Sequence, residues 1–297
     1  MVGLWQMARL VEAVRPGARL VLVGDPGQLS SIEAGAVLGD IVGPASGDGI
    51  VVLERVHRYG AGIDELATAI RAGDAAAALQ VLEAAPEGVT WLRDGDLAPV
   101  RERAVATGRA LFDAARAGDA TGALEALDGF RVLCAHRQGP AGVTTWTAAI
   151  ERWLTEAVPG FSAERRPYAG QPLLVTENDY GLGLFNGDAG VVVAENGRLA
   201  AAFKRGRGIE RFSPGRLDAV ETVFAMTVHK SQGSQFGTAA VLLLDLESRL
   251  LTRELLYTAI TRARERLILA GTEETIRVAV ERPIARASGL RRLLWSA

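Results

Sequence analysis

The sequence predicts an α/β protein with parallel sheets, on three observations. Short continuous apolar runs, typical of strands buried on both faces, recur along the chain. Stretches with apolar residues at helical spacing alternate with them. Several runs end in turns rich in Gly and polar residues, as parallel strands do where they pass into helices. The runs that we expect as strands are residues 18–23, 50–53, 89–92, 130–135, 172–176, 221–226, 239–245 and 267–270.

The first part of the chain is expected to be mostly helical. Apolar residues recur at helical spacing over residues 4–14, and Arg15-Pro16-Gly17 then ends that helix. The strand at 18–23 leads into the turn GDPGQL, and the strand at 50–53 leads into ERVHRYG. Residues 63–128 read as helical around the strand at 89–92, with Pro99 placed for a capped helix start after Asp96.

The second part is expected to hold a further βα series with a small β insertion. The strand at 130–135 passes through HRQGPAG into a helix at 143–157. Between residues 187 and 212 short strands and turn signals replace the helical pattern, and Asn196-Gly197 between two apolar runs predicts a hairpin. The sheet then resumes, with a helix at 253–262 before its last strand.

Composition narrows the function classes. The chain has 297 residues, room for two domains, and a net charge of −2, so any nucleic-acid binding must come from a local groove. Cys134 is the one cysteine and can form no internal disulfide, which favours a reducing cytoplasm. The N-terminal residues lack a signal-peptide pattern and no run reaches membrane-spanning length, so we expect neither secretion nor membrane insertion.

The stretch with the most chemistry is TVHKSQGSQ, residues 227–235, between two expected strands. Thr227 and His229 alternate with Val228, so their side chains lie on one side, where they could meet a nucleic acid. Lys230 and Gly233 would then turn toward a nucleotide, since Gly-containing turns at the carboxyl edge of a sheet bind phosphates. A structural role for the histidine is the alternative.

The turn GDPGQL offers a second candidate site. Gly24 and Gly27 allow a tight turn, and Asp25 and Gln28 project from the carboxyl end of the expected strand. Gln28 could orient a water or sense a terminal phosphate. A plain βα turn with a hydrogen-bonded aspartate explains the same residues.

Two arginines, Arg58 in LERVHRYG and Arg262 in AITRARER, are candidates to face a γ-phosphate. A planar guanidinium that keeps its charge suits the oxygens of a transferring phosphoryl group. The chain has only two lysines, Lys204 and Lys230, and many arginines. Because arginine is so common here, each of the two arginines taken alone is also explained as a solvated residue on a helix.

Two loops are candidates for contacts to nucleic acid. The loop at 177–188, ENDYGLGLFNGD, interleaves Asn178, Tyr180, Phe185 and Asn186 with glycines, and exposed aromatic rings there could stack on unpaired bases. The alternative is a hairpin turn whose Leu184 and Phe185 fill the core. In HRQGPAG, His136 and Arg137 could contact phosphates, with the same alternative of a structural role.

Two features of a complete nucleotide site are absent from the sequence. A phosphate-binding loop of the form GxxxxGK[ST] does not occur, and neither lysine stands in such a context. An acidic pair that would hold magnesium is also missing, since Asp245 after the run VLLL has no phosphate loop upstream.

Taken together, the segments resemble the superfamily 1 DNA helicases and, among them, the RecD family. GDPGQL resembles helicase motif III, LERVHRYG motif IV, FAMTVHKSQGSQF motif V and LLYTAITRARERL motif VI, in the family's order. The resemblance implies RecA-like P-loop NTPase motor domains, the second with a small SH3-like insertion. It also implies an ATP-dependent 5′ to 3′ helicase in the RecBCD (exodeoxyribonuclease V) double-strand-break repair complex, with RecB-like and RecC-like partners and single-stranded DNA.

The resemblance also implies roles for individual residues. Gln28, Arg58 and Arg262 would face the γ-phosphate, and Gln235, where the family usually has Glu, would lie near the ribose. The other residues on the nucleotide side would be Gly24, Asp25, Lys230 and Gly233. The residues on the DNA side would be Thr227, His229, His136, Arg137, Asn178, Phe185 and Asn186.

The resemblance further implies that this chain is the trailing part of a helicase subunit. Residues 1–128 would be the remainder of a first motor domain, and 129–297 a second motor domain with its insertion at about 189–218. The main ligands of ATP and Mg²⁺ would lie upstream, so we expect no ATPase activity from the chain alone. The alternatives are a free-standing or relaxase-type helicase, a non-catalytic single-stranded DNA-binding module, and a truncated reading frame without a stable product.

Overall fold

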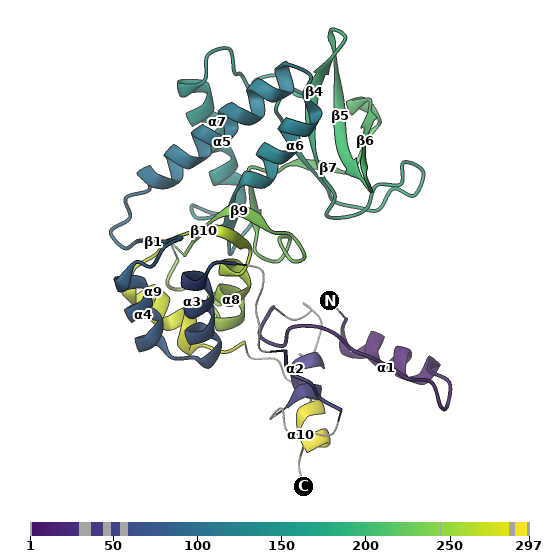
Figure 1. Cartoon of the computed structure of the whole chain (residues 1–297), viewed down its shortest axis with the longest axis vertical. Helices are drawn as coiled ribbons and strands as arrows, with labels where there is room; N and C mark the ends of the chain where they lie inside the picture. The colour runs from purple at the N-terminus through teal and green to yellow at the C-terminus, as the bar shows by residue number, and fades with distance from the viewer. Residues whose placement is uncertain are drawn as a thin grey trace.

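The computed structural model describes residues 2–29, 37–43, 49–53, 59–243, 245–284 and 289–295. Over these ranges the chain forms two five-stranded sheets with helices around them (Figure 1). Among the described residues, no helix is both long enough and apolar enough to cross a membrane. The expected α/β class with parallel strands is confirmed.

The first sheet is entirely parallel and buried on both faces. Neighbouring residues of one strand point to opposite faces, so Val132 and Leu133 enter two different core clusters, as do Val241 and Leu242. Burial on both faces explains why these strands read as continuous apolar runs. In spatial order the strands are β1 (Val89–Leu92), β10 (Ala263–Ala270), β9 (Phe236–Leu242), β2 (Phe130–Cys134) and β8 (Ala225–Thr227).

Helices cover both faces of the parallel sheet (Figure 1). Side-chain caps start several of them: Asp74, Asp119, Thr252 and Thr272 each accept a hydrogen bond from a backbone N–H of the first turn. One face carries α5 (Ala98–Arg116), α6 (Ala120–Gly129) and α7 (Val143–Ala157). The other carries α3 (Ala61–Ala72), α4 (Ala75–Ala84), α8 (Arg253–Ile260) and α9 (Glu273–Glu281).

The second sheet is antiparallel and confirms the expected β insertion. It packs through β4 against α5 and α6 (Figure 1). The hairpin at Asn196-Gly197 is also confirmed, since both residues have positive φ, 49° and 76°, as a two-residue turn of this kind requires. Its strands are β6 (Gly208–Phe212), β5 (Arg198–Arg205), β4 (Ala189–Glu195), β3 (Pro172–Val175) and β7 (Val220–Thr222), with a short 3₁₀ turn at Pro214–Arg216.

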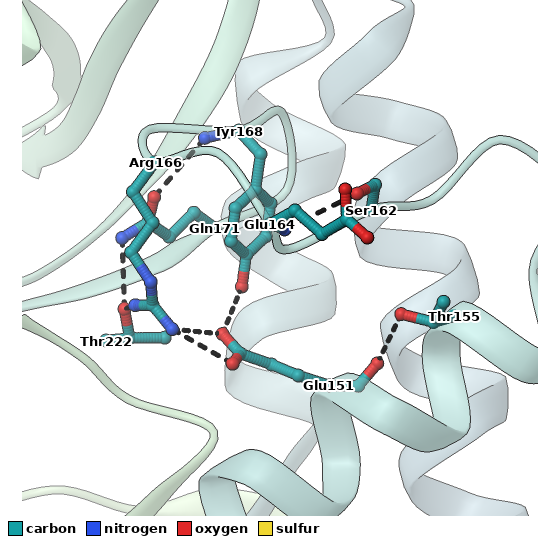
Figure 2. A network of polar contacts seen from close by, with 8 residues as sticks. All are labelled: Glu151, Thr155, Ser162, Glu164, Arg166, Tyr168, Gln171 and Thr222. Carbon is teal, nitrogen blue, oxygen red and sulfur yellow. Dashed lines mark hydrogen bonds and ion pairs between the residues drawn. The ribbon is translucent and has the colours of Figure 1, made fainter.

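A partly exposed polar network joins this second sheet to α7 (Figure 2). The Glu151 carboxylate accepts two hydrogen bonds from the Arg166 guanidinium, at 2.7 and 2.9 Å, and one from the Tyr168 hydroxyl at 2.7 Å. Thr222 of β7 accepts from Gln171 at 3.0 Å and also from Arg166. Burial raises the pKa of Tyr168, and the Glu151 carboxylate adds to the effect, so the hydroxyl stays a donor at neutral pH.

Three further helices lie away from the sheets: α1 (Leu4–Ala13), α2 (Val37–Val42) and α10 (Leu290–Trp295) (Figure 1). Helix α1 has no buried residue, while α2 and α10 meet where Trp295 Nε1 donates to the Asp40 carbonyl at 2.8 Å. The strands expected at 18–23 and 50–53 are wrong, because neither segment is a strand and Val23 and Leu53 are 89% and 82% exposed. An apolar run becomes a strand only beside a partner strand, and no described strand pairs with these segments.

Two further expectations need correction. The single strand expected at 221–226 is wrong: β7 belongs to the antiparallel sheet and β8 to the parallel sheet, with Val223 and Phe224 buried at the crossing. The antiparallel sheet also reaches from 172 to 222, beyond the expected 189–218. Strand β1 pairs with β10, so a division at residue 128 cuts through the unit that holds the parallel sheet.

Candidate functional site

The GDPGQL turn is held against helix α8 by Asp25. Its carboxylate accepts hydrogen bonds from Gln28 Nε2 at 2.9 Å, from the Gly27 N–H at 3.0 Å and from the Tyr257 hydroxyl at 3.0 Å. Gly27 lies against the Tyr257 ring, since a Cβ at this position would be in ordinary contact with it at 3.4 Å. The Gln28 side chain is thereby oriented by a carboxylate that α8 also contacts.

Leu29, the next residue after Gln28, fixes the end of this turn. Its N–H donates to Thr258 Oγ1 of α8 at 2.8 Å, and its carbonyl accepts from Gln232 Nε2 at 2.7 Å. The side chain is buried in the core cluster that α3 and α8 share. The turn therefore contacts α8 and the 227–235 segment, both more than two hundred residues away in sequence.

Arg262 joins the same interface, just after α8. It is 4% exposed, and its guanidinium donates to the Thr258 carbonyl at 3.0 Å, the Ser234 carbonyl at 3.2 Å and Thr261 Oγ1 at 3.2 Å. The hydrogen bonds therefore link Arg262, the 227–235 segment and the GDPGQL turn into one cluster. Arg58, the fourth expected member, lies outside the described residues.

Two tyrosines sit next to this cluster as neutral donors. Burial raises the pKa of Tyr257, and the Asp25 carboxylate raises it further. Burial also raises the pKa of Tyr59, which hydrogen-bonds with Tyr257. Both hydroxyls keep their protons at neutral pH, so Tyr257 can donate to the Asp25 carboxylate throughout the physiological range.

The second group of expected residues lies where β2 and β8 end at the carboxyl edge of the parallel sheet. Cys134 and Thr227 are register partners, so Arg137 and Lys230, three residues further on in each case, follow neighbouring strand ends. Glu221 of β7 pairs with both cations: its carboxylate accepts from Arg137 Nη2 at 3.0 Å and forms an ion pair with Lys230 Nζ. Lys230, expected on the nucleotide side, thus lies beside a residue expected on the DNA side.

His136 lies at the same edge, with its Nε2 2.7 Å from Ser248 Oγ and 3.6 Å from the Asp245 carboxylate. A hydrolytic Ser-His-Asp triad places the serine and the aspartate on different ring nitrogens. Here both face the same nitrogen, so the three residues do not form a proton relay. They instead connect the segment after β2 to the segment after β9.

Strand β8 ends at Thr227 and residues 228–233 form a turn, so the segment is not extended and does not place Thr227 and His229 by simple alternation. Val228 is 1% exposed, while Thr227 and His229 on either side are half-buried. Gly233 is exposed with a φ of 86°, a left-handed conformation that favours glycine. The remaining residues expected on the nucleotide side, Gln235 and Gly24, are half-buried and exposed respectively.

In the loop at 177–188 one of the two residues expected to fill the core is buried and the other is exposed. Leu184 is 1% exposed and fills a core cluster of the second sheet, whereas Phe185 is 44% and Tyr180 80% exposed. The two aromatic rings pack edge to face with centroids 6.1 Å apart. Asn178 holds the loop, since its Oδ1 accepts from the Asn186 N–H at 2.9 Å. The loop therefore presents an aromatic pair to solvent.

The described residues do not fit a metal ion. No group of three or more His, Cys, Asp or Glu side chains arranged to hold a metal occurs among them.

Sequence reasoning missed four residues of these contacts. Tyr257 and Thr258 lie inside the quoted segment YTAITRAR, and Gln232 lies inside TVHKSQGSQ, so their proximity to other motif residues was the available signal. Glu221 carried no such signal, because its position depends on the chain leaving β7 of the antiparallel sheet and entering β8 of the parallel sheet within a single apolar run.

Comparisons with known proteins define the class of this fold and site. Residues 1–91 match the family described as AAA domain, and residues 222–270 match the UvrD-like helicase C-terminal domain. The second match contains both the 227–235 segment and α8 with Arg262. The class is therefore that of the superfamily 1 helicases.

Within this class the chain belongs to the RecD family. It is 52% identical over 295 residues to the RecBCD enzyme subunit RecD of Mycolicibacterium smegmatis, an alignment that covers 99% of this chain and 52% of that protein. It is 31% identical over 290 residues to the ATP-dependent RecD2 DNA helicase of Deinococcus radiodurans, covering 95% of this chain and 36% of that protein. The chain thus spans about half the length of the first of these relatives.

Among solved structures, Bacteroides Pif1 bound to single-stranded DNA aligns with a TM-score of 0.47 at 16% identity, over 89% of this chain and 65% of that one. A likeness at this level carries no argument about function.

Proposed function

We propose that this chain forms part of an ATP-dependent 5′ to 3′ DNA helicase subunit that acts in a RecBCD-type complex on double-strand breaks. One observation carries the proposal: the GDPGQL turn, the 227–235 segment and Arg262 are joined by hydrogen bonds although they are distant in sequence. Family membership supports it independently. Polarity, break repair, RecB-like and RecC-like partners and a cytoplasmic location come from the relationship to RecD alone.

The nucleotide side of the proposed machine is the cluster around Asp25. Gln28 and Arg262 would respond to the γ-phosphate, together with Arg58, and Asp25 would hold Gln28 in place. Gly24, Gly233 and Gln235 complete the proposed nucleotide-side residues, and Lys230 would stand where the nucleotide side meets the DNA side, since Glu221 pairs with both Lys230 and Arg137. ATP bound by the leading half of a full-length subunit would meet these residues here, where an arginine can stabilise the charge of the transferring phosphoryl group and a glutamine can orient the attacking water.

The DNA side of the proposed machine is the carboxyl edge near Thr227, His229, His136 and Arg137, together with the loop at 177–188. Support comes from the half-buried Thr227 and His229 and from the exposed ring of Phe185. Asn178 and Asn186 shape that loop through their mutual hydrogen bond. Exposed aromatic rings on a firm loop suit stacking with unpaired bases.

The domain organisation is part of the proposal. We infer two RecA-like motor domains in the full-length subunit. Residues 59–284 would be most of the second, since β1 completes its sheet, and the residues before 59 would belong to the first. The antiparallel sheet would be the SH3-like insertion. On this reading the chain alone lacks the phosphate-binding loop, and purified residues 1–297 should show no DNA-stimulated ATPase activity.

The test uses a protein of the relatives' full length that contains this chain. Arg262→Ala should abolish ATP hydrolysis while single-stranded DNA binding remains, because the guanidinium serves the γ-phosphate and not the DNA. Arg264→Ala is the matched control, since Arg264 lies two residues away and is exposed. Unchanged turnover in Arg262→Ala would remove Arg262 from this role. Robust turnover by residues 1–297 alone would contradict the proposed division of the site.

A free-standing helicase is the second candidate, favoured by the 31% identity to the RecD2 helicase. Affinity purification of the full-length protein from its own cells distinguishes the two. Stoichiometric recovery of two large partner subunits supports the RecBCD-type assignment. Recovery of an active helicase without them supports the free-standing one.

A further inference from the structure

Glu221 lies between two cations that come from different strand ends. Its carboxylate accepts a hydrogen bond from Arg137 Nη2 at 3.0 Å and pairs with Lys230 Nζ. Arg137 follows β2 and Lys230 follows β8, which are neighbours in the parallel sheet. Glu221 itself comes from β7 of the other sheet. Two positive side chains from the parallel sheet thus contact one carboxylate that belongs to the antiparallel sheet.

The backbone on which Glu221 sits is held firmly. Glu221 pairs with Leu174 of β3, and the next residue, Thr222, accepts hydrogen bonds from Gln171 and Arg166 in the network around Glu151 (Figure 2). Adjacent residues of a strand point to opposite faces. Thr222 is therefore anchored toward α7, while Glu221 is directed to the edge where Arg137 and Lys230 lie.

We propose that Arg137 and Lys230 form a phosphate-binding site that Glu221 occupies until a ligand phosphate displaces its carboxylate. A carboxylate and a phosphate present similar oxygen acceptors to a guanidinium and an ammonium. The displaced ion pairs are weak, because the Arg137, Lys230 and Glu221 side chains are 64%, 35% and 31% exposed. Glu221 therefore lowers affinity for phosphates without closing the site.

The ligand class is a phosphate ester, and it has two possible sources. A phosphodiester of single-stranded DNA is the source that the surroundings favour, since Thr227 Oγ1 accepts the Lys230 N–H at 3.3 Å and ties the site to the proposed DNA edge. The phosphates of a nucleotide are the other source. This part of the inference rests on the proposed function, whereas the competition by Glu221 holds for either source.

The experiment compares Glu221→Gln with the unchanged chain, using a fluorescent oligo-dT strand and anisotropy over a series of KCl concentrations. Removing the competing charge while keeping the side-chain shape should tighten binding up to about fivefold. The slope of the logarithm of the association constant against the logarithm of salt concentration should stay the same, because in both complexes the same two cations hold the phosphate and the same DNA counterions are released. Adding Arg137→Gln and Lys230→Gln to Glu221→Gln should cancel the gain.

Glu210→Gln is the matched control. Glu210 lies in β6 of the same sheet, is 57% exposed and is 3.7 Å from Arg205, so it also loses an ion pair but leaves Arg137 and Lys230 untouched. Its DNA affinity and salt slope should equal those of the unchanged chain. A second arm measures displacement of a fluorescent ATP analogue by inorganic pyrophosphate. A gain confined to this arm would identify nucleotide phosphates as the source.

The outcomes separate the two proposals. Suppose that the unchanged chain binds DNA in a salt-dependent manner, and that Glu221→Gln changes neither the affinity for DNA nor the affinity for the ATP analogue. The competition by Glu221 is then overturned, while DNA binding stands. If no protein binds DNA but Glu221→Gln gains affinity for the ATP analogue, the DNA edge is wrong while the competition stands. No gain in any arm, with a folded variant by circular dichroism, overturns the inference.

Discussion

Residues 2–24 and 49–53 differ from residues 59–284 in one respect that composition does not reveal. Both regions contain continuous apolar runs, yet Val21, Val23 and Val51 are 69%, 89% and 81% exposed, while Leu133 and Val241 are 0% and 1% exposed. The difference is the presence of partner strands. Strand β2 lies between β9 and β8, whereas the runs at 18–23 and 50–53 pair with no described strand.

This contrast shows how far an apolar run determines structure. Hydrophobic burial is available to a run only when neighbouring strands satisfy its backbone hydrogen bonds and helices cover its faces. The boundary between the two behaviours falls inside the GDPGQL turn, because Gly24 is exposed while Leu29 is buried against α8. The stability of the chain should therefore come from residues 59–284 with Leu29 docked on them.

The largest expected effect tests whether residues 59–284 supply most of the stability. Leu133→Ala in β2 should lower the free energy of unfolding by about 3 kcal/mol, because a fully buried leucine loses its contacts and leaves a cavity. Leu53→Ala, the same substitution at an 82% exposed position, should change it by less than about 0.5 kcal/mol. Urea unfolding followed by circular dichroism measures both. Equal losses would mean that the 50–53 run is packed in solution.

A smaller effect is expected at the junction between the two sheets. Glu151→Ala leaves the buried Tyr168 hydroxyl and the Arg166 guanidinium without their acceptor, which should cost about 2 kcal/mol. The control is Glu12→Ala in α1, where the ion pair with Arg9 is more than 60% exposed on both sides and should contribute almost nothing.

A double-mutant cycle with Tyr168→Phe refines this second prediction. If Glu151 and Tyr168 act through their 2.7 Å hydrogen bond, the double variant should lose less than the sum of the single losses. Additive losses would show that the hydrogen bond contributes little to joining the sheets.

Much of the fold of residues 59–284 was predictable, because its elements carry local signals. Helix α7 and strand β1 have the expected bounds, and the Asn196-Gly197 hairpin forms as its sequence requires. What sequence could not supply is pairing. The failed strands at 18–23 and 50–53 and the split of 221–226 between two sheets are all errors about which strands lie side by side.

The contacts between the motif segments were less predictable than the fold. The motif segments contain Gln28, Lys230 and Arg262, but sequence could not show that Asp25 links Gln28 to Tyr257. The nucleotide-side role expected for Lys230 stays a prediction, and sequence could not show that Lys230 shares the Glu221 carboxylate with Arg137. Arg58 stays a prediction, since it lies outside the described residues.

An effect of intermediate size is expected in the pH dependence of stability, through the buried thiol of Cys134. Burial raises the pKa of the Cys134 thiol from 9.0 to about 12. The folded state thus favours the neutral thiol, and the stability that this group contributes is complete below pH 9 and is lost as pH rises toward 12. At pH 10 the loss of stability from this group should be on the order of 1 kcal/mol relative to pH 7.

Cys134→Ala supplies the comparison for this measurement. The variant should lose some stability at every pH but should lack the extra decline that the thiol adds between pH 9 and 10, whereas the decline from the buried tyrosines is common to both proteins. Parallel pH profiles for the two proteins would show that the thiol is accessible to water in the folded state.

The smallest expected effect is a gain. Ala85 at the end of α4 has φ 45° and ψ 57°, a left-handed conformation in which its Cβ is strained, so Ala85→Gly should stabilise the protein by about 0.5 kcal/mol. Gly17→Ala is the opposite change at a φ of 81° in the N-terminal region, where a Cβ would have no neighbour within 4 Å. If residues 2–24 do not unfold with the sheets, Gly17→Ala should leave the urea midpoint unchanged despite its strained backbone. A midpoint lowered as far as Ala85→Gly raises it would show instead that the N-terminal region folds cooperatively with the parallel sheet.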